Sequence, residues 1–285
     1  MSTPAEFLQS GLTYYRQQNL LAAEQMFLQA VAADARFGDA HHLAGVTALQ
    51  LGRPNDAVNR LQAATGCPAP KAEWFGNLGT ALCTLQKPDE AVDAYNNALK
   101  IDDGFVDAWF NLATTFRQLE RVDEADRAFR EALARNPQHA GALNNLGTLL
   151  REQNRSAEAL DVLQRAAELP KANAEAWYNY SNALRDDGRI DEQLAALQEA
   201  DRRRPNMPRI RSALGLAQLT LGQYESGWAG YEWRLRSEGG GIDSRCQPIW
   251  DGGSLDGRRI AVFAEQGFGD VIPVSYTHLT LPTKA

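Results

Sequence analysis

Long hydrophobic runs are missing from this sequence, and so is an excess of positive charge. No uninterrupted apolar stretch approaches the roughly 20 residues that a membrane-spanning helix needs. The N-terminus has no basic stretch followed by an apolar core, so no secretory signal is expected. A formal net charge of -7 disfavours general attraction to nucleic acid or to an anionic membrane. We therefore expect a cytoplasmic protein that binds neither nucleic acid nor membrane.

Cysteine is scarce as well, and the usual catalytic motifs are missing. Cys67, Cys83 and Cys246 are odd in number and far apart, which suits a reducing compartment. No CxxC motif and no Cys/His pairing has the spacing of a metal site. No nucleophile elbow and no phosphate-binding loop is present either. We expect no metal, no cofactor and no catalytic centre within this chain.

What the sequence does contain is a period of 34 residues. One column holds alanine, at Ala23, Ala57, Ala91, Ala125 and Ala159. Four residues later a second column holds large apolar residues, at Phe27, Leu61, Tyr95, Phe129, Leu163, Leu197 and Tyr231. A third column, in the first half of each period, holds small residues, at Gly11, Gly45, Gly79, Ala113, Gly147, Ser181 and Gly215. Spacings of three and four around these columns predict two amphipathic helices per period, packed closely where the small residues lie.

The pattern resembles the tetratricopeptide repeat over residues 4 to about 207. It predicts an all-α superhelical solenoid of antiparallel helix pairs, wound right-handed around a concave groove. The expected repeats cover 4–37, 38–71, 72–105, 106–139, 140–173 and 174–207. A seventh stretch, 208–237, keeps the spacing but replaces the alanines of the second helix with Gly227 and Arg234, so an atypical terminal repeat is expected there.

One polar column on the first helices predicts a binding surface, because repeat arrays bind partners with their concave face. Asparagine recurs at Asn77, Asn111, Asn145 and Asn179. A side-chain amide offers a donor and an acceptor together, so a row of amides can hold an extended peptide by its backbone. The alternative interpretation is structural: the asparagines satisfy groups between repeats, or persist only because the repeat was duplicated.

Three further columns accompany the asparagines. Arginine recurs at Arg117, Arg151 and Arg185, and a mixed column holds Phe110, Asn144 and Tyr178. The arginines suggest tolerance for acidic side chains of a ligand, or are only solvated and paired with nearby acids. Hydroxyl and amide groups at Thr80, Thr114, Thr148 and Asn182 lie between them. All these side chains together predict a floor for an extended polypeptide.

The asparagine column resembles the ladder in the tetratricopeptide half of protein O-GlcNAc transferases. That resemblance implies a ladder that binds the backbone of a substrate protein. A different use of the same repeat, the carboxylate clamp for chaperone tails, needs lysines in the groove. None of the five lysines falls in these columns, which disfavours the clamp.

After the repeats the composition changes. YESGWAGYEWR at 224–234 and PIWDGGSLDGRRIAVFAEQGFGDVI at 248–272 resemble bacterial proteins that join tetratricopeptide repeats to a glycosyltransferase domain with two Rossmann halves. The resemblance implies a linker over 238–257 and a first strand and loop over 258–272, with Gly267, Gly269 and Asp270 facing a cleft. A nucleotide sugar would bind in a second half that this chain does not contain.

The last residues depart from this pattern. VSYTHLTLPT at 274–283 can be encoded by the reverse read of a transposase-type sequencing adaptor. We expect natural sequence to end at Ile272 and residues 273–285 to be a non-native tail, which makes this chain a truncated fragment.

Two functions remain open on these grounds. In the first, the repeats present acceptor polypeptides to a glycosyltransferase domain missing from the chain, so the parent protein would be the enzyme. In the second, the chain is an adaptor for protein–protein interaction without catalysis. The bound peptide, the sugar and the oligomeric state do not follow from the sequence.

Overall fold

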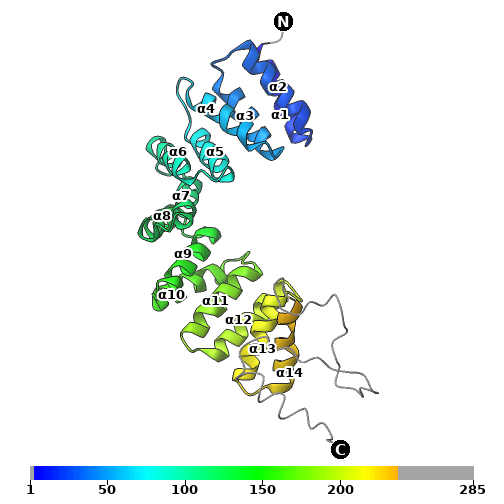
Figure 1. The fold of residues 1–285 in the computed structure, drawn as a ribbon, viewed down its shortest axis with the longest axis vertical. Coiled ribbons are helices and arrows are strands. Elements are labelled where there is room, and N and C mark those ends of the chain that lie inside the picture. Colours follow the sequence, from blue (N-terminus) through cyan, green and yellow to red (C-terminus); the bar gives the residue numbers. More distant parts are fainter. Residues whose placement is uncertain (1–2, 237–285) are drawn as a thin grey trace, which may run out of the picture. The chain divides into compact units, whose positions relative to one another are not determined.

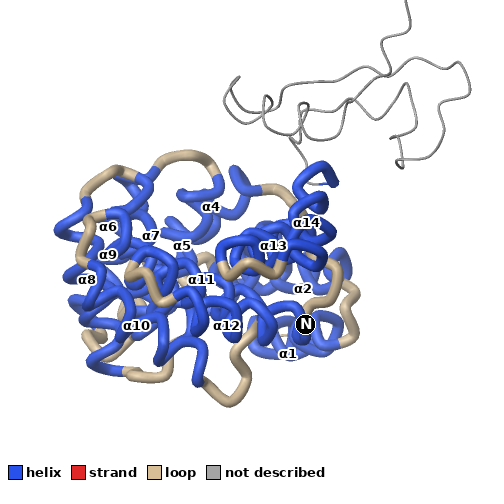
Figure 2. The backbone as a smooth tube through the Cα atoms, turned by 90° about the horizontal axis from the view of Figure 1, so that it is seen from below, coloured by secondary structure: helices blue, strands red, loops and turns tan. Residues whose placement is uncertain are grey.

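The computed structural model describes residues 3–236, which form fourteen α-helices and one short 3-10 helix (Figure 1). The first helices of the seven pairs are α1 (Pro4–Arg16), α3 (Gly38–Gln50), α5 (Ala72–Thr84), α7 (Val106–Gln118), α9 (Ala140–Glu152), α11 (Ala174–Asp186) and α13 (Pro208–Thr220). The second helices are α2 (Leu20–Ala33), α4 (Pro54–Thr65), α6 (Pro88–Ile101), α8 (Val122–Arg135), α10 (Ser156–Glu168), α12 (Ile190–Arg203) and α14 (Tyr224–Tyr231). The 3-10 helix η1 (Glu232–Arg236) follows α14. Within the described range only helices and loops are found, as Figure 2 shows.

The chain divides into two compact units, Met1–Arg203 and Arg204–Ala285. The first unit holds α1 to α12, and the described part of the second holds α13, α14 and η1. Each of the seven ranges expected from the sequence contains one pair of helices. The expected linker (238–257), Rossmann-like strand and loop (258–272) and tail (273–285) all lie outside the described residues.

Each turn between paired helices contains one residue with left-handed backbone. These residues, again 34 apart, are Gln18, Gly52, Gln86, Glu120, Asn154, Gly188 and Gly222, with φ between 58° and 76°. The following N–H donates to the carbonyl five residues earlier, as from Arg53 to Ala48 O at 2.9 Å. This hydrogen bond is the Schellman closure of a helix C-terminus, which favours glycine at the left-handed position. Only three of the seven positions hold glycine.

The two helices of a pair meet at the small column expected from the sequence. A Cβ added to Gly79 would lie 2.6 Å from the Tyr95 ring, and one added to Gly45 would lie 2.7 Å from Leu61 Cγ. Tyr95 and Leu61 are both buried. The large residue therefore fills the space that the missing side chain leaves, and it stands 16 residues after the small one.

The terminal pair α13 and α14 replaces this side-chain contact with a backbone contact. A Cβ on Gly215 would overlap the backbone of Tyr231 and lie 2.5 Å from Gly230 C and 2.6 Å from Gly227 O. At position 227 glycine replaces the repeat's alanine, and here the two helices lie closer together than in the other pairs. The atypical sequence of this repeat has a packing reason.

Charged side chains also join consecutive pairs on the side of the second helices. Asp126 on α8 accepts hydrogen bonds from Arg130 and from Arg155, the residue that precedes α10. Glu158 on α10 accepts from Arg155 at 2.7 Å and from Arg130 at 2.9 Å. These bonds, the first from Arg155 and the second from Arg130, lower the pKa of Glu158. Because Asp126 is buried and each group has two partners, this network ties α8 to α10 more firmly than isolated surface pairs do.

We predict that Gly79→Ala destabilises the protein although alanine favours helices. The new methyl group would overlap the buried Tyr95 ring, and overpacking of this kind costs about 1 to 2 kcal/mol net. Gly66→Ala is the matched control, because Gly66 is exposed and a Cβ there meets nothing closer than 3.5 Å. Urea unfolding followed by circular dichroism measures both. Equal stability of the two variants would show that the small column does not set the helix distance.

We also predict opposite effects of two changes at the left-handed turn positions. Glu120→Gly should stabilise the chain and Gly188→Ala should destabilise it, each by about 1 kcal/mol, because left-handed backbone disfavours residues with a Cβ. A Cβ at Gly188 has nothing within 4 Å, so steric contact does not contribute there. The melting temperatures of both variants measure these changes in stability. Shifts of the same sign in the two variants would contradict the prediction.

Candidate functional site

The first helices of neighbouring pairs contact one another, which joins their exposed sides into one surface. α3 packs on α5, α5 on α7, α7 on α9, and α9 on α11. Within residues 3–203, the backbones of successive second helices do not pack as closely, and the charged network between α8 and α10 is made by long side chains. The first helices therefore lie closer together and form the inner side of the stack. We call the surface of α3, α5, α7, α9 and α11 the first-helix face, and all the expected site residues belong to these helices.

Side chains on this face follow a contact rule that differs from the repeat by one residue. Several of them meet the residue 35 positions away on the neighbouring first helix, not the one 34 positions away; an exception is Cys83, whose Sγ lies 3.4 Å from Thr115 Oγ1, 32 positions further on. At the N-terminal end the hydrogen-bonded pair is Tyr15–Gln50. In the asparagine column it is His42–Asn77, and in the arginine column Arg117–Glu152. Residues of the columns that the sequence predicts to face a ligand thus also connect one pair of helices to the next.

Two of the four asparagines are engaged in this way. Asn77 Nδ2 donates to His42 Nε2 at 2.7 Å, and Asn179 Nδ2 donates to Asn144 Oδ1 at 3.4 Å. Burial lowers the pKa of His42, which favours the neutral ring that accepts such a bond. For Asn77 and Asn179 the structural interpretation therefore describes at least part of what the amide does.

Asn111 and Asn145 lack such a partner. The residues 35 positions before them are Gly76, which has no side chain, and Phe110, which has no hydrogen-bonding group. Within residues 3–236 neither amide makes a side-chain hydrogen bond, although both residues are half-buried. Their donors and acceptors remain available at the surface of α7 and α9.

The arginine column is paired with carboxylates of the same protein. Arg117 Nη2 lies 2.7 Å from Glu152 Oε1, and Arg151 Nη2 lies 2.6 Å from Asp186 Oδ2. Arg185 Nη2 lies 3.2 Å from Asp186 Oδ1. The positive charge that the column suggested for an acidic ligand is therefore balanced internally, and the arginines tie α7 to α9 and α9 to α11.

The mixed column is used in three different ways. The Phe110 ring lies 4.8 Å from the His139 ring and 6.1 Å from that of Phe129. Asn144 Nδ2 donates to the carbonyl of Ala140 at 3.1 Å. Tyr178 is half-buried on α11.

The threonines between these columns are oriented by their own helices. Thr80, Thr114 and Thr148 each donate a hydroxyl proton to the carbonyl four residues earlier, at 2.9 to 3.1 Å. The hydroxyl oxygens of Thr114 and Thr148 can therefore still accept a hydrogen bond, whereas that of Thr80 also lies 3.3 Å from Tyr95 Oη.

A hollow opens on the first-helix face between α5 and α7, with a volume of about 560 Å³. We call it the α5–α7 hollow. It lies beside Gly76, where the Phe105 ring takes the place of the missing side chain: a Cβ added to Gly76 would lie 2.9 Å from Phe105 Cε1. Three expected site residues line the hollow, Asn77, Phe110 and Asn111.

Sequence reasoning missed the acidic side of this hollow. Its lining also includes Glu73, Asp102 and Asp107, together with His139 and Phe105. His139 Nδ1 accepts the N–H of Ala142 at 3.0 Å and so caps the start of α9. Glu73 and Asp107 both lie in the first turn of their helices, and this common position is the signal from which the sequence could have predicted them together.

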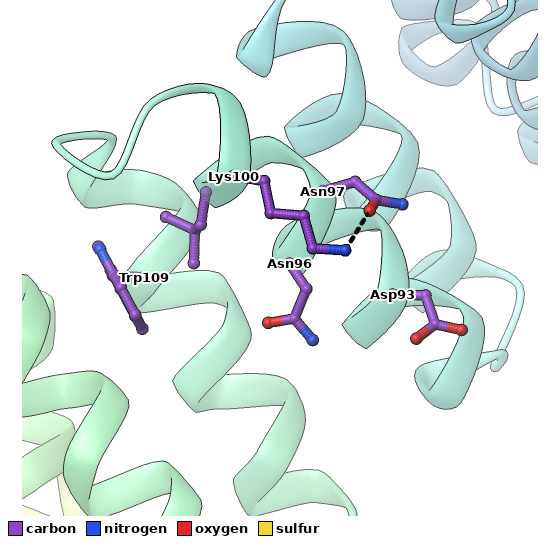
Figure 3. Close-up of a pocket in the computed structure, with 6 residues that line it drawn as sticks. Asp93, Asn96, Asn97, Lys100 and Trp109 are labelled. Atoms are coloured by element: carbon purple, nitrogen blue, oxygen red, sulfur yellow. Dashed lines mark hydrogen bonds between the residues drawn. The ribbon is translucent and has the colours of Figure 1, made fainter.

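A second hollow lies between the second helix α6 and the outer side of α7 (Figure 3). Its labelled residues on α6 are Asp93, Asn96, Asn97 and Lys100, and Trp109 comes from α7. Lys100 Nζ donates to Asn97 Oδ1 at 3.1 Å. None of the expected site residues lies here.

Within the described part of the chain, no group of three or more His, Cys, Asp or Glu side chains is arranged to hold a metal ion. None of the helices in residues 3–236 has the length and apolar character needed to cross a membrane.

Solved structures with the same fold are similar over much of the chain. The protein pilF of Pseudomonas aeruginosa is 18% identical with a TM-score of 0.63, and the match covers 78% of this chain and 97% of that one. The MamA protein is 21% identical with a TM-score of 0.54, over 58% of this chain and 90% of that one. YrrB, described as a tetratricopeptide-repeat protein with an unusual peptide-binding site, is 20% identical with a TM-score of 0.53, over 60% and 88%. At these identities the likeness shows a shared fold.

No curated protein matches the chain. The family described as Tetratricopeptide repeat matches it in five overlapping stretches, 8–68, 42–104, 77–125, 110–174 and 162–208. Together they span every helix pair of the first unit, and the helix pairs and their small-to-large packing have the form that this repeat predicts. The chain belongs to the tetratricopeptide-repeat family.

Proposed function

We propose that the first-helix face binds an extended polypeptide, held by its backbone. The observation that carries this proposal is the pair of free amides on neighbouring helices, Asn111 on α7 and Asn145 on α9. Each presents a donor and an acceptor to a peptide group, and no side chain of the described residues uses them.

The surroundings of these amides suit an extended chain. The α5–α7 hollow lies beside Asn111, and Phe110 supplies apolar surface against which a peptide side chain can pack. Thr114 and Thr148 add acceptors for peptide N–H groups. A similar structure, YrrB, is described as having a peptide-binding site, which supports polypeptide as the kind of partner.

The two remaining asparagines take a different role in this proposal. Asn77 and Asn179, the first and last asparagines of the column, already donate to His42 and Asn144 on the preceding first helices. Their carbonyl oxygens remain available as acceptors. The proposed site is therefore centred on α7 and α9.

Expected binding can be tested on an array of unrelated extended peptides. We predict that Asn111→Ala with Asn145→Ala weakens binding about tenfold, because two hydrogen bonds of about 1 kcal/mol each are lost, with some compensation by water. The loss should be similar for all peptides, since the lost contacts are to the backbone.

The matched control is Asn96→Ala with Asn97→Ala, which removes two half-buried asparagines from the second helix α6. It should leave peptide binding unchanged, and circular dichroism should show equal helix content in all three proteins. Equal binding by the control and by the Asn111/Asn145 variant would refute the proposed site.

A narrower role is presentation of the bound polypeptide to a linked glycosyltransferase, and the resemblance of 224–234 and 248–272 to such proteins supports it. An adaptor role without catalysis shares the same binding step. The gene sequence beyond Ile272 separates the two. An open frame with alternating strands and helices favours the first, and a frame without them favours the adaptor.

A further inference from the structure

We infer that the α5–α7 hollow selects a basic side chain, so that the bound polypeptide carries lysine or arginine at one position. This inference rests on the proposed function, because the hollow lies beside the amides proposed to hold the backbone. It reverses the charge preference that the arginine column suggested.

The first argument is the place of the hollow. Gly76 alone has no side chain in the mixed column of His42, Gly76, Phe110, Asn144 and Tyr178, and the Phe105 ring packs against it: a Cβ added to Gly76 would lie 2.9 Å from Phe105 Cε1. The hollow of about 560 Å³ opens beside this ring and next to Asn111. A ligand side chain that enters the hollow therefore meets an apolar wall close to the amide proposed to hold the backbone.

The second argument is charge. Glu73, Asp102 and Asp107 line the hollow, and neither lysine nor arginine is among its lining residues. The carboxylates are exposed, and Asp102 Oδ1 accepts only the N–H of Gly104, at 3.0 Å. The nearest cationic candidate, His139, has Nε2 3.8 Å from Asp107 Oδ1. His139 Nδ1 accepts the N–H of Ala142, and 3.8 Å is too long for a hydrogen bond from Nε2 to Asp107, so the Asp107 carboxylate keeps its acceptors for a ligand.

The third argument is the shape of the apolar wall. Phe105 and Phe110 line the hollow next to the carboxylates. Lysine and arginine have apolar stems and a charged end, so the stem can lie against the rings while the end reaches the acids. Aromatic faces attract cations as well. An acidic or neutral polar side chain would gain none of these contacts.

The helix N-termini act in the opposite direction, because their partial positive charge already stabilises Glu73 and Asp107. That effect is equivalent to about half a charge for each helix. Three carboxylates therefore leave an excess of negative charge in the hollow.

The probe is a set of neutral peptides of Ser, Thr and Gln with a single lysine moved one position at a time. Matched peptides carry acetyl-lysine, which keeps the stem and removes the charge. We expect the wild-type protein to bind the best lysine peptide about fivefold more tightly than its acetylated counterpart at low salt. In Glu73→Gln with Asp107→Asn that difference should largely disappear, while binding of the acetylated peptide stays the same.

Asp161→Asn with Glu168→Gln is the matched control, since it removes the same two charges from exposed positions on α10. It should keep the preference for lysine. Equal loss in both variants would overturn the inference, because the net charge of the protein would then be its cause. Equal wild-type affinity for lysine and acetyl-lysine peptides would overturn it too, while leaving backbone binding intact. Absence of binding even to the acetylated peptides would reject the proposed function itself, and the inference with it.

Discussion

The close approach of two helices at one small residue is the constraint on which the rest of this structure depends. Gly45 and Gly79 leave room for Leu61 and Tyr95, which are buried between the helices of their own pair. This contact sets the distance between the helices within each pair. Because each pair exposes an apolar side, it then stacks on the next, and the first helices come into contact with one another. The first-helix face and its hollow follow from that stacking.

Much of this arrangement could be predicted from the columns at intervals of 34 residues, because packing inside a repeat involves residues at fixed spacing in one short segment. The contacts between repeats could not. Many hydrogen bonds between first helices join residues 35 apart, an offset that depends on how one first helix is placed against the next, and no column in the sequence records it. Asn77 and Asn111 therefore look equivalent in sequence, yet Asn77 donates to His42, whereas the residue 35 positions before Asn111 is Gly76, which has no side chain.

Two other features could not be predicted from the sequence, each for its own reason. The left-handed turn position holds glycine in three of the seven pairs and residues such as Gln86 and Glu120 in the other four, so composition gives only a weak signal there. The acidic side of the hollow combines residues from α5, α7 and the loop before α7, which the stacking alone brings together. The arginine column was recognised in the sequence, but its role was not. The carboxylate partners of Arg117 and Arg151 belong to the next repeat, so the sequence columns did not show the pairing.

The paired arginines have a mechanical consequence for the first-helix face. Between α1 and α3 the contact at this position is a neutral hydrogen bond, Tyr15 with Gln50, whereas from α7 to α11 it is an ion pair at each step. Exposed ion pairs weaken as dissolved ions screen them over a distance of about 8 Å at physiological ionic strength. The side-chain contacts between α7, α9 and α11 are therefore weakened by salt. The neutral hydrogen bond between α1 and α3 is not weakened in this way. A change in ionic strength would alter the bending stiffness of the solenoid locally, at the α7–α11 segment where the free amides lie.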